Sequence, residues 1–500
     1  MRPPTLLLTL ILLATCACAW AVETQPVDTP PSPTPLALDE IDSLATIDDV
    51  VELIPALPEP LGADLPVMIW GTPEPAGRDA LEVERLLQER GLCVMHNIGA
   101  ANADGLDAIA EIVRYRHEQG WPAPVLCQSW GQVAFRAERV PKHDPPAEQD
   151  GKRYPCIARY EEALLIEQGR VEAKLDALVE RGIEPDLFLL DWEIWYRRVW
   201  ASDGEGLADA LEQARACPVC SAQLPAEYLE SPAGLMRGLE TLRGEIARRA
   251  FVEPVKARFP DAQIGNYFCS SHVRSDQPLT ECRRVVGWHG SGFDFSQPTA
   301  YGRYWTYHRD PEFVGWNVFW KYLGEFSDMA RHQVGDEYQL PWSLRLLTYE
   351  PEEPFEVKGA AGPTQVWAWP RESYREYLRH VMLRGARSLC MFNPNRAAPG
   401  NRLMYLTELQ DVLGVFAEMR EFAEILRDGD PLNLDPPPGA MSSHEGAVVW
   451  SGVATDERAV VRAVSFTGQD EPITVDVFGE QVSLHAPPNG QTWLLGAHAQ

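Results

Sequence analysis

The 500-residue chain lacks an apolar run long enough to cross a membrane. A membrane-spanning helix needs about 20 consecutive, predominantly apolar residues. The apolar run at residues 6–13 is much shorter, and no later segment approaches the required length. We therefore expect no membrane-spanning helix in this protein.

Positive charge is also scarce, because 44 Lys and Arg residues stand against 73 Asp and Glu residues, for a formal net charge of −29. Such a surface repels phosphate groups and anionic lipids, so nucleic acid and anionic membranes are excluded as partners. It also disfavours polyanionic glycans, unless the cleft that binds them is locally basic. Arg197 and Arg198 provide a candidate for such a basic region.

Paired cysteine motifs are almost absent. Among the 10 cysteines, the one motif is Cys217-Pro218-Val219-Cys220, and a zinc ribbon requires a second pair at similar spacing. We therefore interpret Cys217 and Cys220 as a local disulfide, with metal binding or redox chemistry as alternatives. Cys269 and Cys282 are spaced to close a further short loop.

The N-terminus has the features of an export signal. Arg2 precedes the apolar run at residues 6–13, and Ala19-Trp20-Ala21 matches a small-x-small cleavage site. Residues 1–21 are therefore interpreted as a signal peptide, which predicts a periplasmic, cell-surface or extracellular protein. The alternative is an N-terminal lipid anchor on Cys16, although Thr15 is a poor residue before a modified cysteine.

Residues 22–61 are rich in Pro, Asp and Glu, with a proline-dense centre at residues 30–35. This composition cannot bury much apolar surface, so it predicts a disordered, extended tether. Residues 46–57 are the one stretch that would suit a short helix.

Residues 62–428 alternate between strand-like and helix-like segments. Eight strand-then-helix units in succession favour a (β/α)8 barrel over a doubly wound sheet, which would more often have a Gly-rich turn after its first strand. The predicted strands are residues 65–70, 93–98, 125–129, 187–193, 263–268, 293–299, 343–349 and 388–393.

A proline-containing linker at residues 428–439 ends the predicted barrel. Residues 440–500 then contain short alternating runs of apolar and polar residues, separated by turn residues. This pattern predicts a small antiparallel β-sandwich domain.

The fourth predicted strand ends in the sequence Asp191-Trp192-Glu193-Ile194-Trp195. Side chains alternate along a strand, so Asp191 and Glu193 point to the same side. Carboxylates are expensive to bury, and the carboxyl ends of barrel strands are where barrel enzymes keep their catalytic groups. The structural alternative is a buried acid pair neutralised by Arg197 or Arg198.

The ends of the other predicted strands carry amides, carboxylates and aromatic rings. This combination suits sugars, whose C–H faces pack on aromatic rings and whose hydroxyl groups hydrogen-bond to planar polar groups. The predicted substrate-binding residues are Trp70, Asn97, Gln128, Trp130, Trp195, Asn266, Tyr267, Asp294, Gln297, Tyr301, Trp305, Tyr349 and Asn393. No metal ion and no cofactor is expected, and the expected partner is a carbohydrate substrate.

Three polar residues near the predicted strand ends also have a structural interpretation. Asp294 lies between two phenylalanines and would suit a wholly buried position, and His96 would suit a hydrogen-bonded core histidine. Glu350 opens the sequence Glu350-Pro351-Glu352-Glu353, which would also suit a solvated acidic turn.

The positions of Asp191 and Glu193 restrict the mechanism. A glycosidase with two protein carboxylates needs them on opposite sides of the scissile bond. Asp191 and Glu193 approach from one side, so Glu193 is the candidate general acid and a third group must act as nucleophile. Either the substrate's 2-acetamido oxygen attacks while Asp191 orients it, or Glu350 attacks from another strand.

The sequence Asp191-Trp192-Glu193-x-Trp195 resembles the strand-four signature of the hyaluronidase family of glycoside hydrolases. That resemblance implies a (β/α)8-like barrel, retention assisted by the substrate, Glu193 as proton donor and Asp191 as the residue that positions the acetamido group. It covers about a dozen residues, and Tyr196-Arg197-Arg198 replaces the Arg-Pro that usually continues the family's motif.

The sequence therefore predicts an exported glycoside hydrolase that acts on a polysaccharide or glycoconjugate. A non-catalytic carbohydrate-binding protein on a barrel scaffold is the second hypothesis, since a fold does not dictate its activity. A thiol or metal protein centred on Cys217 and Cys220 is the third.

Overall fold

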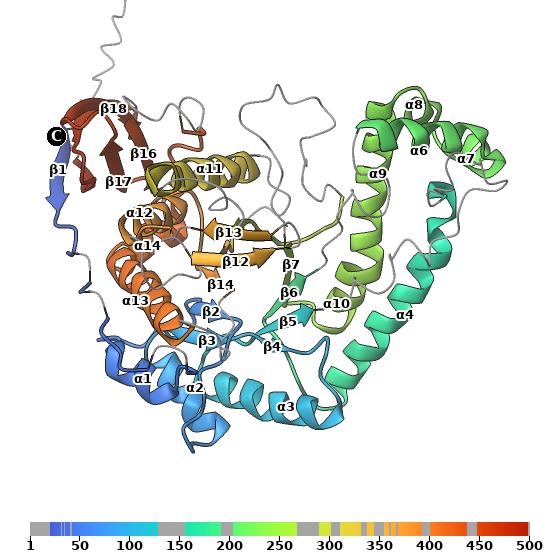
Figure 1. Cartoon of the computed structure of the whole chain (residues 1–500), viewed down its shortest axis with the longest axis horizontal. Helices are drawn as coiled ribbons and strands as arrows, with labels where there is room; N and C mark the ends of the chain where they lie inside the picture. Colours follow the sequence, from blue (N-terminus) through green and yellow to red (C-terminus); the bar gives the residue numbers. More distant parts are fainter. Residues whose placement is uncertain are drawn as a thin grey trace, which may run out of the picture.

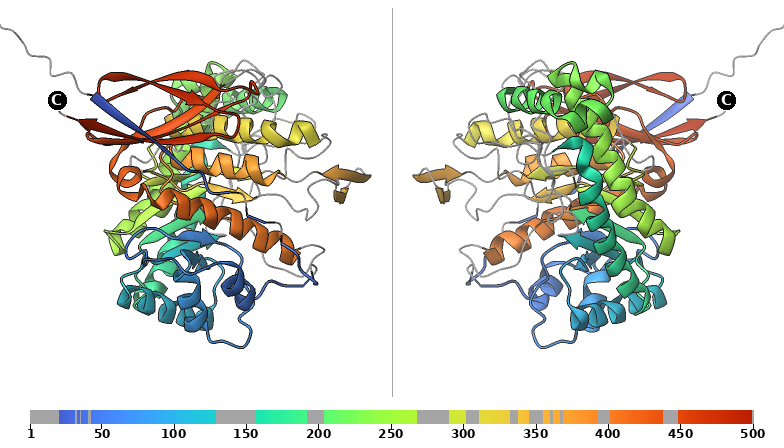
Figure 2. Two further views of the ribbon diagram at one scale, coloured as in Figure 1. Left: turned by 90° about the vertical axis from the view of Figure 1, so that its left-hand side faces the viewer. Right: turned by 90° about the vertical axis from the view of Figure 1, so that its right-hand side faces the viewer.

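Parallel strands form the centre of the molecule, helices surround them, and an antiparallel sheet packs against one side (Figures 1 and 2). We describe this arrangement from a computed structural model. The described residues are 21–31, 33–34, 36–40, 43–128, 156–191, 204–267, 290–301, 311–331, 338–344, 355–359, 362–366, 369–392, 401–437 and 448–498.

The central strands close into a barrel. Two parallel sheets, in the orders β10-β8-β7-β6-β5-β4 and β3-β2-β14-β11-β9, join at three places where one strand is briefly interrupted. Counting each interrupted strand once gives the eight strands that the sequence predicts, and the (β/α)8 barrel is confirmed. The bounds are β2 Val67–Ile69, β3 Leu92–Val94, β4 His96–Asn97, β5 Pro124–Gln128, β6 Leu187–Asp191, β7 Gln263–Tyr267, β8 Phe295–Gln297, β9 Thr299–Tyr301, β10 Tyr338–Gln339, β11 Trp342–Leu344 and β14 Cys390–Met391.

The interruptions have a local cause in two of the three places. Pro298 separates β8 from β9, and Pro341 precedes β11. Proline has no backbone N–H group, so it cannot donate to a neighbouring strand and breaks the ladder where it occurs. The neighbouring strands nevertheless keep their parallel register on both sides of these prolines.

Helices α2, α3 and α9 begin at polar residues whose side chains accept from a free N–H group of the first turn. Asp79 accepts from the Glu82 N–H, Asn102 from the Gly105 N–H, and Ser231 from the Gly234 N–H. The helices are α1 Ile47–Leu53, α2 Ala80–Gln88, α3 Ala103–Glu118, η1 Ile157–Arg159, α4 Tyr160–Val179, α6 Gly204–Ala216, α7 Pro218–Gln223, α8 Ala226–Leu229, α9 Pro232–Ala247, η2 Arg248–Val252, α10 Glu253–Arg258, α11 Pro311–Arg331, α12 Arg371–Met382, α13 Asn401–Arg420 and α14 Ala423–Asp428. Within the described ranges, none of them combines the length and apolarity that a bilayer crossing requires.

The barrel interior is filled by large apolar side chains. Phe295 lies over Gly265 of the neighbouring strand β7, where a Cβ atom would come within 2.3 Å of the Phe295 ring. Glycine at this position therefore leaves the space that the ring occupies. The interior cluster consists of Met68, Met95, Leu126, Leu187, Leu189, Phe295, Leu340 and Cys390.

The C-terminal domain is built from antiparallel strands. A five-stranded sheet in the order β1-β20-β17-β16-β15 faces a two-stranded sheet, and their apolar side chains share one core. The bounds are β1 Ala21–Val27, β15 Asp430–Pro431, β16 Val448–Ala454, β17 Arg458–Ser465, β18 Glu471–Val477, β19 Glu480–Ala486 and β20 Gln491–His498, and a separate hairpin consists of β12 Phe355–Gly359 and β13 Gly362–Val366.

The prediction of a disordered tether at residues 22–61 is corrected for the residues that the structure describes. Strand β1 pairs along its whole length with β20, so an N-terminal segment completes the C-terminal sheet (Figures 1 and 2). Helix α1 buries Ile47 and Val50 against the barrel, and Arg402 on α13 forms an ion pair with Asp49. The composition indicated disorder because it describes the segment as a whole. It does not report that a few apolar residues pack against segments elsewhere in the chain.

A buried charged network joins the C-terminal sheet to barrel helix α12. Arg462 on β17 donates two hydrogen bonds of 2.6 Å to the carboxylate of Glu376. His380, one turn further along α12, contacts Glu376 through Nε2 at 3.2 Å and the Ser451 hydroxyl through Nδ1 at 2.7 Å. The two domains are therefore connected by ionic contacts as well as by apolar packing.

We expect His380 to make stability depend on pH. Burial lowers the pKa of His380 to about 4, although Glu376 lies beside it. In the unfolded chain His380 takes up a proton near its usual pKa of 6.5, whereas in the folded chain it does so only near pH 4. The folded state therefore loses stability as the pH falls from 6.5 through about 4. Between pH 7 and pH 5 the free energy of unfolding should fall by about 2 kcal/mol. Urea titrations at the two pH values measure this difference, and the same loss in His380→Gln would assign it to other groups.

Candidate active site at the carboxyl ends of the barrel strands

Strand β6 carries the first carboxylate of the acidic motif. Leu187 and Leu189 face the barrel interior, whereas Phe188 and Leu190 face the surrounding helices. Because side chains alternate, Asp191 continues the interior-facing series at the carboxyl end of β6. It is 7% exposed. The structure therefore places Asp191 at the end of the barrel where barrel enzymes keep their catalytic groups.

Neighbouring strand ends bring other predicted residues to the same end of the barrel. The backbone register pairs Gln128 of β5 with Asp191, and Tyr267 of β7 with Gln297 of β8. Gln297 is buried on the strand face that it shares with Phe295. Tyr301 ends β9.

An aromatic pair and an amide occupy the strand ends across the barrel. Trp70 follows β2 and contacts Phe392 edge to face, with ring centroids 5.0 Å apart. The Asn97 side-chain oxygen accepts hydrogen bonds from the Gly99 and Ala100 N–H groups. These bonds hold the Asn97 side chain at the end of β4. One end of the barrel thus combines a carboxylate, amides and aromatic rings.

Asp294 is a correction to the predicted site. It precedes β8 and therefore lies at the amino end of the strands, opposite Asp191. Its carboxylate accepts from the Ile264 N–H at 2.9 Å and forms an ion pair with Lys256 on α10 at 2.9 Å. Asp294 connects β7, β8 and α10, which is a structural role.

Two further polar residues lie on the helix side of their strands. Asn266 is fully buried on the face of β7 that it shares with Ile264, so its position favours a structural role over substrate binding. His96 lies beside Glu84 of α2, at 3.7 Å, and burial lowers its pKa. This position agrees with the interpretation of His96 as a core histidine.

Three of the predicted residues are described by their backbones alone, and seven lie outside the described ranges. The side chains of Gln128, Tyr267 and Tyr301 are not described, although their backbones are. The predicted residues outside the described ranges are Trp130, Glu193, Trp195, Trp305, Tyr349, Glu350 and Asn393.

Two hollows in the described part of the molecule lie away from the strand ends. One of about 320 Å³ is lined by Leu65, Gln263 and Phe416 near the amino ends of the strands. The other, of about 570 Å³, lies between α3 and α4 and is lined by Leu106 and Lys174. Neither includes a predicted site residue, so neither competes with the strand ends as the candidate site.

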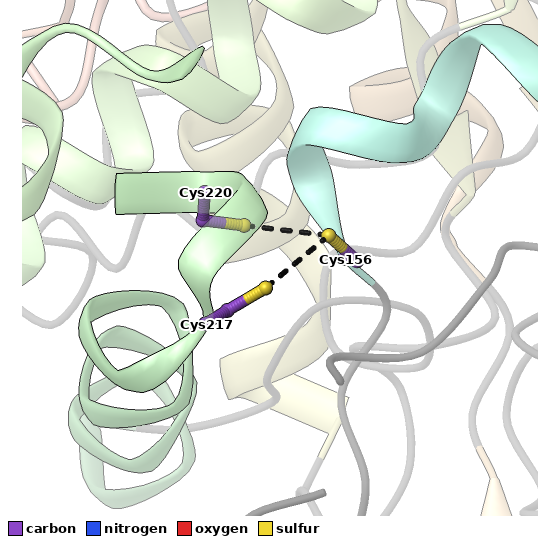
Figure 3. Close-up of side chains that lie close together, drawn as sticks. All are labelled: Cys156, Cys217 and Cys220. Atoms are coloured by element: carbon purple, nitrogen blue, oxygen red, sulfur yellow. Dashed lines mark hydrogen bonds between the residues drawn. The ribbon is translucent and has the colours of Figure 1, made fainter. Parts of the chain in front are cut away.

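The predicted disulfide between Cys217 and Cys220 is a correction. The two cysteines are not joined by a disulfide, and both lie close to a third buried cysteine, Cys156 (Figure 3). Cys156 lies 61 residues before Cys217, so no short motif connects the two in the sequence. The one signal for a third cysteine was that the Cys217–Cys220 motif has no second pair.

Comparisons with known proteins identify no family for this chain. No family model matches the sequence, and no curated protein matches it. Similar solved structures include cyclic α-maltosyl-(1→6)-maltose hydrolase from Arthrobacter globiformis (TM-score 0.40, 12% identity, 92% of this chain and 97% of that one), an Anoxybacillus α-amylase (0.38, 11%, 79% and 80%) and an endoxylanase from Clostridium papyrosolvens (0.35, 10%, 89% and 98%). These values are too low to carry an argument about activity.

Proposed function

We propose that this protein is an exported glycoside hydrolase that cleaves O-glycosidic bonds in a polysaccharide or glycoconjugate. Glu193 is its general acid and base, and Asp191 orients the substrate's 2-acetamido group if that group attacks the anomeric carbon. The observation that carries the proposal is the interior-facing position of Asp191 at the carboxyl end of β6. Glu193 follows two residues later in the sequence.

The surroundings of Asp191 support a sugar as substrate. Trp70 and Phe392 supply aromatic surface at this end of the barrel, and Asn97 and Gln297 supply amides. Sugar rings pack their C–H faces on aromatic rings, and their hydroxyl groups bind planar polar groups. Neither a metal ion nor a cofactor is needed for this chemistry.

Two mechanisms agree with carboxylates on one side of the substrate. In the first, the 2-acetamido oxygen of an N-acetylhexosaminide attacks the anomeric carbon while Glu193 protonates the leaving oxygen, as the resemblance to the hyaluronidase motif implies. Water then attacks the anomeric carbon and opens the resulting oxazoline ring, with Glu193 acting as base. In the second, Glu350 forms a covalent glycosyl-enzyme, which water hydrolyses.

Replacement of Glu350 by Gln separates the two mechanisms. Turnover should remain nearly intact if the substrate's acetamido group attacks, and fall by orders of magnitude if Glu350 is the nucleophile. Initial rates on the best glycan measure the difference. Glu352→Gln, in the same acidic stretch of sequence, is the matched control and should retain wild-type turnover under either mechanism.

The proposal as a whole is tested by screening the purified protein on a glycan panel, with the stereochemistry of the first product followed. Release of reducing ends with retained configuration supports both mechanisms. A carbohydrate-binding protein without catalysis predicts a different result: glycan binding that survives Asp191→Asn with Glu193→Gln, and no reducing ends from the wild type. That result would replace the proposal.

Export is proposed from the signal-like N-terminus. Cleavage after Ala21 would remove only the first residue of β1, and the rest of the strand would still pair with β20. Lipidation at Cys16 is the alternative. Mass spectrometry of the mature N-terminus distinguishes a chain that begins at Val22 from one that begins at a lipid-modified Cys16.

A further inference from the structure

Three cysteine sulfur atoms converge in the core beside the barrel (Figure 3). The Sγ atom of Cys156 lies 3.4 Å from that of Cys220 and 3.8 Å from that of Cys217, and all three lie within 4.8 Å of one another. All three residues are fully buried. They come from two segments: Cys156 directly precedes η1 and α4, whereas Cys217 and Cys220 flank the start of α7.

These distances suit a shared metal ion better than a covalent bond. A disulfide holds its sulfur atoms about 2.0 Å apart. Thiolates bound to zinc at about 2.3 Å in a tetrahedral site lie roughly 3.8 Å from one another. The measured separations of 3.4 Å and 3.8 Å lie near that second value.

The number of cysteines points the same way. Any disulfide within the cluster would use two sulfur atoms and leave the third thiol buried against it. One metal ion uses all three. Three thiolates form a soft ligand set, which selects zinc-like ions over magnesium or calcium.

The backbone around Cys217 and Cys220 is held in a fixed turn. Pro218 begins α7, and the Ser221 and Leu224 N–H groups donate to the carbonyls of Cys217 and Cys220, so the Cys-x-x-Cys segment has a fixed turn. A backbone hydrogen bond from Ala158 also reaches Cys220. Backbone N–H groups directed at sulfur are the kind of surrounding contact that supports a metal-bound thiolate.

We propose that Cys156, Cys217 and Cys220 bind one zinc ion as a structural site. Binding converts three thiols to thiolates and releases three protons, and a fourth position remains for water or another donor. The ion would connect α7, in the insertion between β6 and β7, to the start of α4 (Figure 1). This proposal is independent of the proposed function, since it concerns a different cluster of residues.

A bound zinc ion would also stabilise the barrel. The chain reaches Cys156 after leaving the carboxyl end of β5, and reaches Cys217 after leaving that of β6, where Asp191 lies. A zinc ion at this cluster would therefore join the segment between β5 and β6 to the segment between β6 and β7. Metal removal should lower the melting temperature, because the three cysteines form a binding site only in the folded chain. The bound ion therefore stabilises the folded state over the unfolded one.

The test uses the full chain, reduced and exchanged with Co²⁺. We expect one zinc ion per chain by elemental mass spectrometry after expression with zinc. After exchange we expect a thiolate-to-cobalt charge-transfer band in the near ultraviolet, together with visible bands of tetrahedral cobalt. These readouts come from the wild-type chain, so they do not depend on whether a variant folds.

Substitutions then identify the ligands. Cys156→Ser and Cys217→Ser should each reduce bound zinc from one per chain to near zero and abolish the cobalt spectrum. Cys127→Ala is the control, because Cys127 is a fully buried cysteine in the same apolar cluster and should leave both readouts unchanged. A reduced wild-type chain without stoichiometric zinc and without a cobalt–thiolate band would overturn the proposal. So would a disulfide within the cluster in peptide maps of the chain as purified.

Discussion

Replacement of Glu193 by Gln is expected to lower the rate of glycan hydrolysis by about 10²–10⁴-fold, since a positioned general acid contributes roughly that factor. Gln has nearly the shape of Glu but cannot give a proton to the leaving oxygen. Both proposed mechanisms use Glu193 in this role, so the expectation holds for either. Initial rates with the natural glycan, at saturating substrate, measure the loss.

A substrate with an activated leaving group provides the internal control. A dinitrophenolate leaves without protonation, so Glu193→Gln should form the first intermediate from a dinitrophenyl glycoside at close to the wild-type rate. Glu111→Gln, at an exposed position of α3, should be unchanged on both substrates. Full activity of Glu193→Gln on every glycan that the wild type cleaves would refute both mechanisms.

The second large effect concerns stability and the contact between the two domains. Glu376 and Arg462 are 5% and 1% exposed, and their paired charges are bound by two hydrogen bonds. Burial opposes ionisation of Glu376, but the Arg462 guanidinium and His380 hold the pKa of that carboxyl well below its usual range. Glu376→Gln would leave Arg462 buried without a counter-charge. We expect a loss of about 3–5 kcal/mol in the free energy of unfolding, measured by urea titration at pH 7.

An exposed ion pair supplies the comparison. Glu89→Gln removes the partner of Arg85 on the surface of α2 and should cost less than about 1 kcal/mol. A double variant, Glu376→Leu with Arg462→Met, removes both buried charges and should recover a large part of the loss. If Glu376→Gln costs no more than Glu89→Gln, the buried pair does not hold the domains together.

The barrel was predictable because its signals are local and repeated. The interior and exterior faces of β6 alternate between Leu187, Phe188, Leu189 and Leu190 in the way that strand periodicity requires. The caps of α2 and α3 are equally local, because Asp79 and Asn102 each accept from an N–H group three residues later. The same alternation predicts from the sequence that Asp191 lies on one strand face with Leu187 and Leu189.

Contacts between distant segments were not predictable in this way. Asp294 resembles a site residue in the sequence, but its partners Ile264 and Lys256 place it at the amino end of the strands. Its position depends on where β8 begins, and predicted strand boundaries are uncertain by several residues. The pairing of β1 with β20 likewise joins opposite ends of the chain, and no local pattern reports it.

The sequence by itself determined the order of strands and helices, the small C-terminal sheet and the strand face that carries Asp191, because each follows from periodicity within a short segment. The tertiary structure alone decided which residues become neighbours. It placed Asp294 at the amino ends of the strands, paired β1 with β20, paired Glu376 with Arg462, and brought Cys156 to Cys217 and Cys220. The physical reason is that these contacts depend on how separate segments pack around a common core. The spacing of two residues in the sequence does not determine the distance between them in the folded chain.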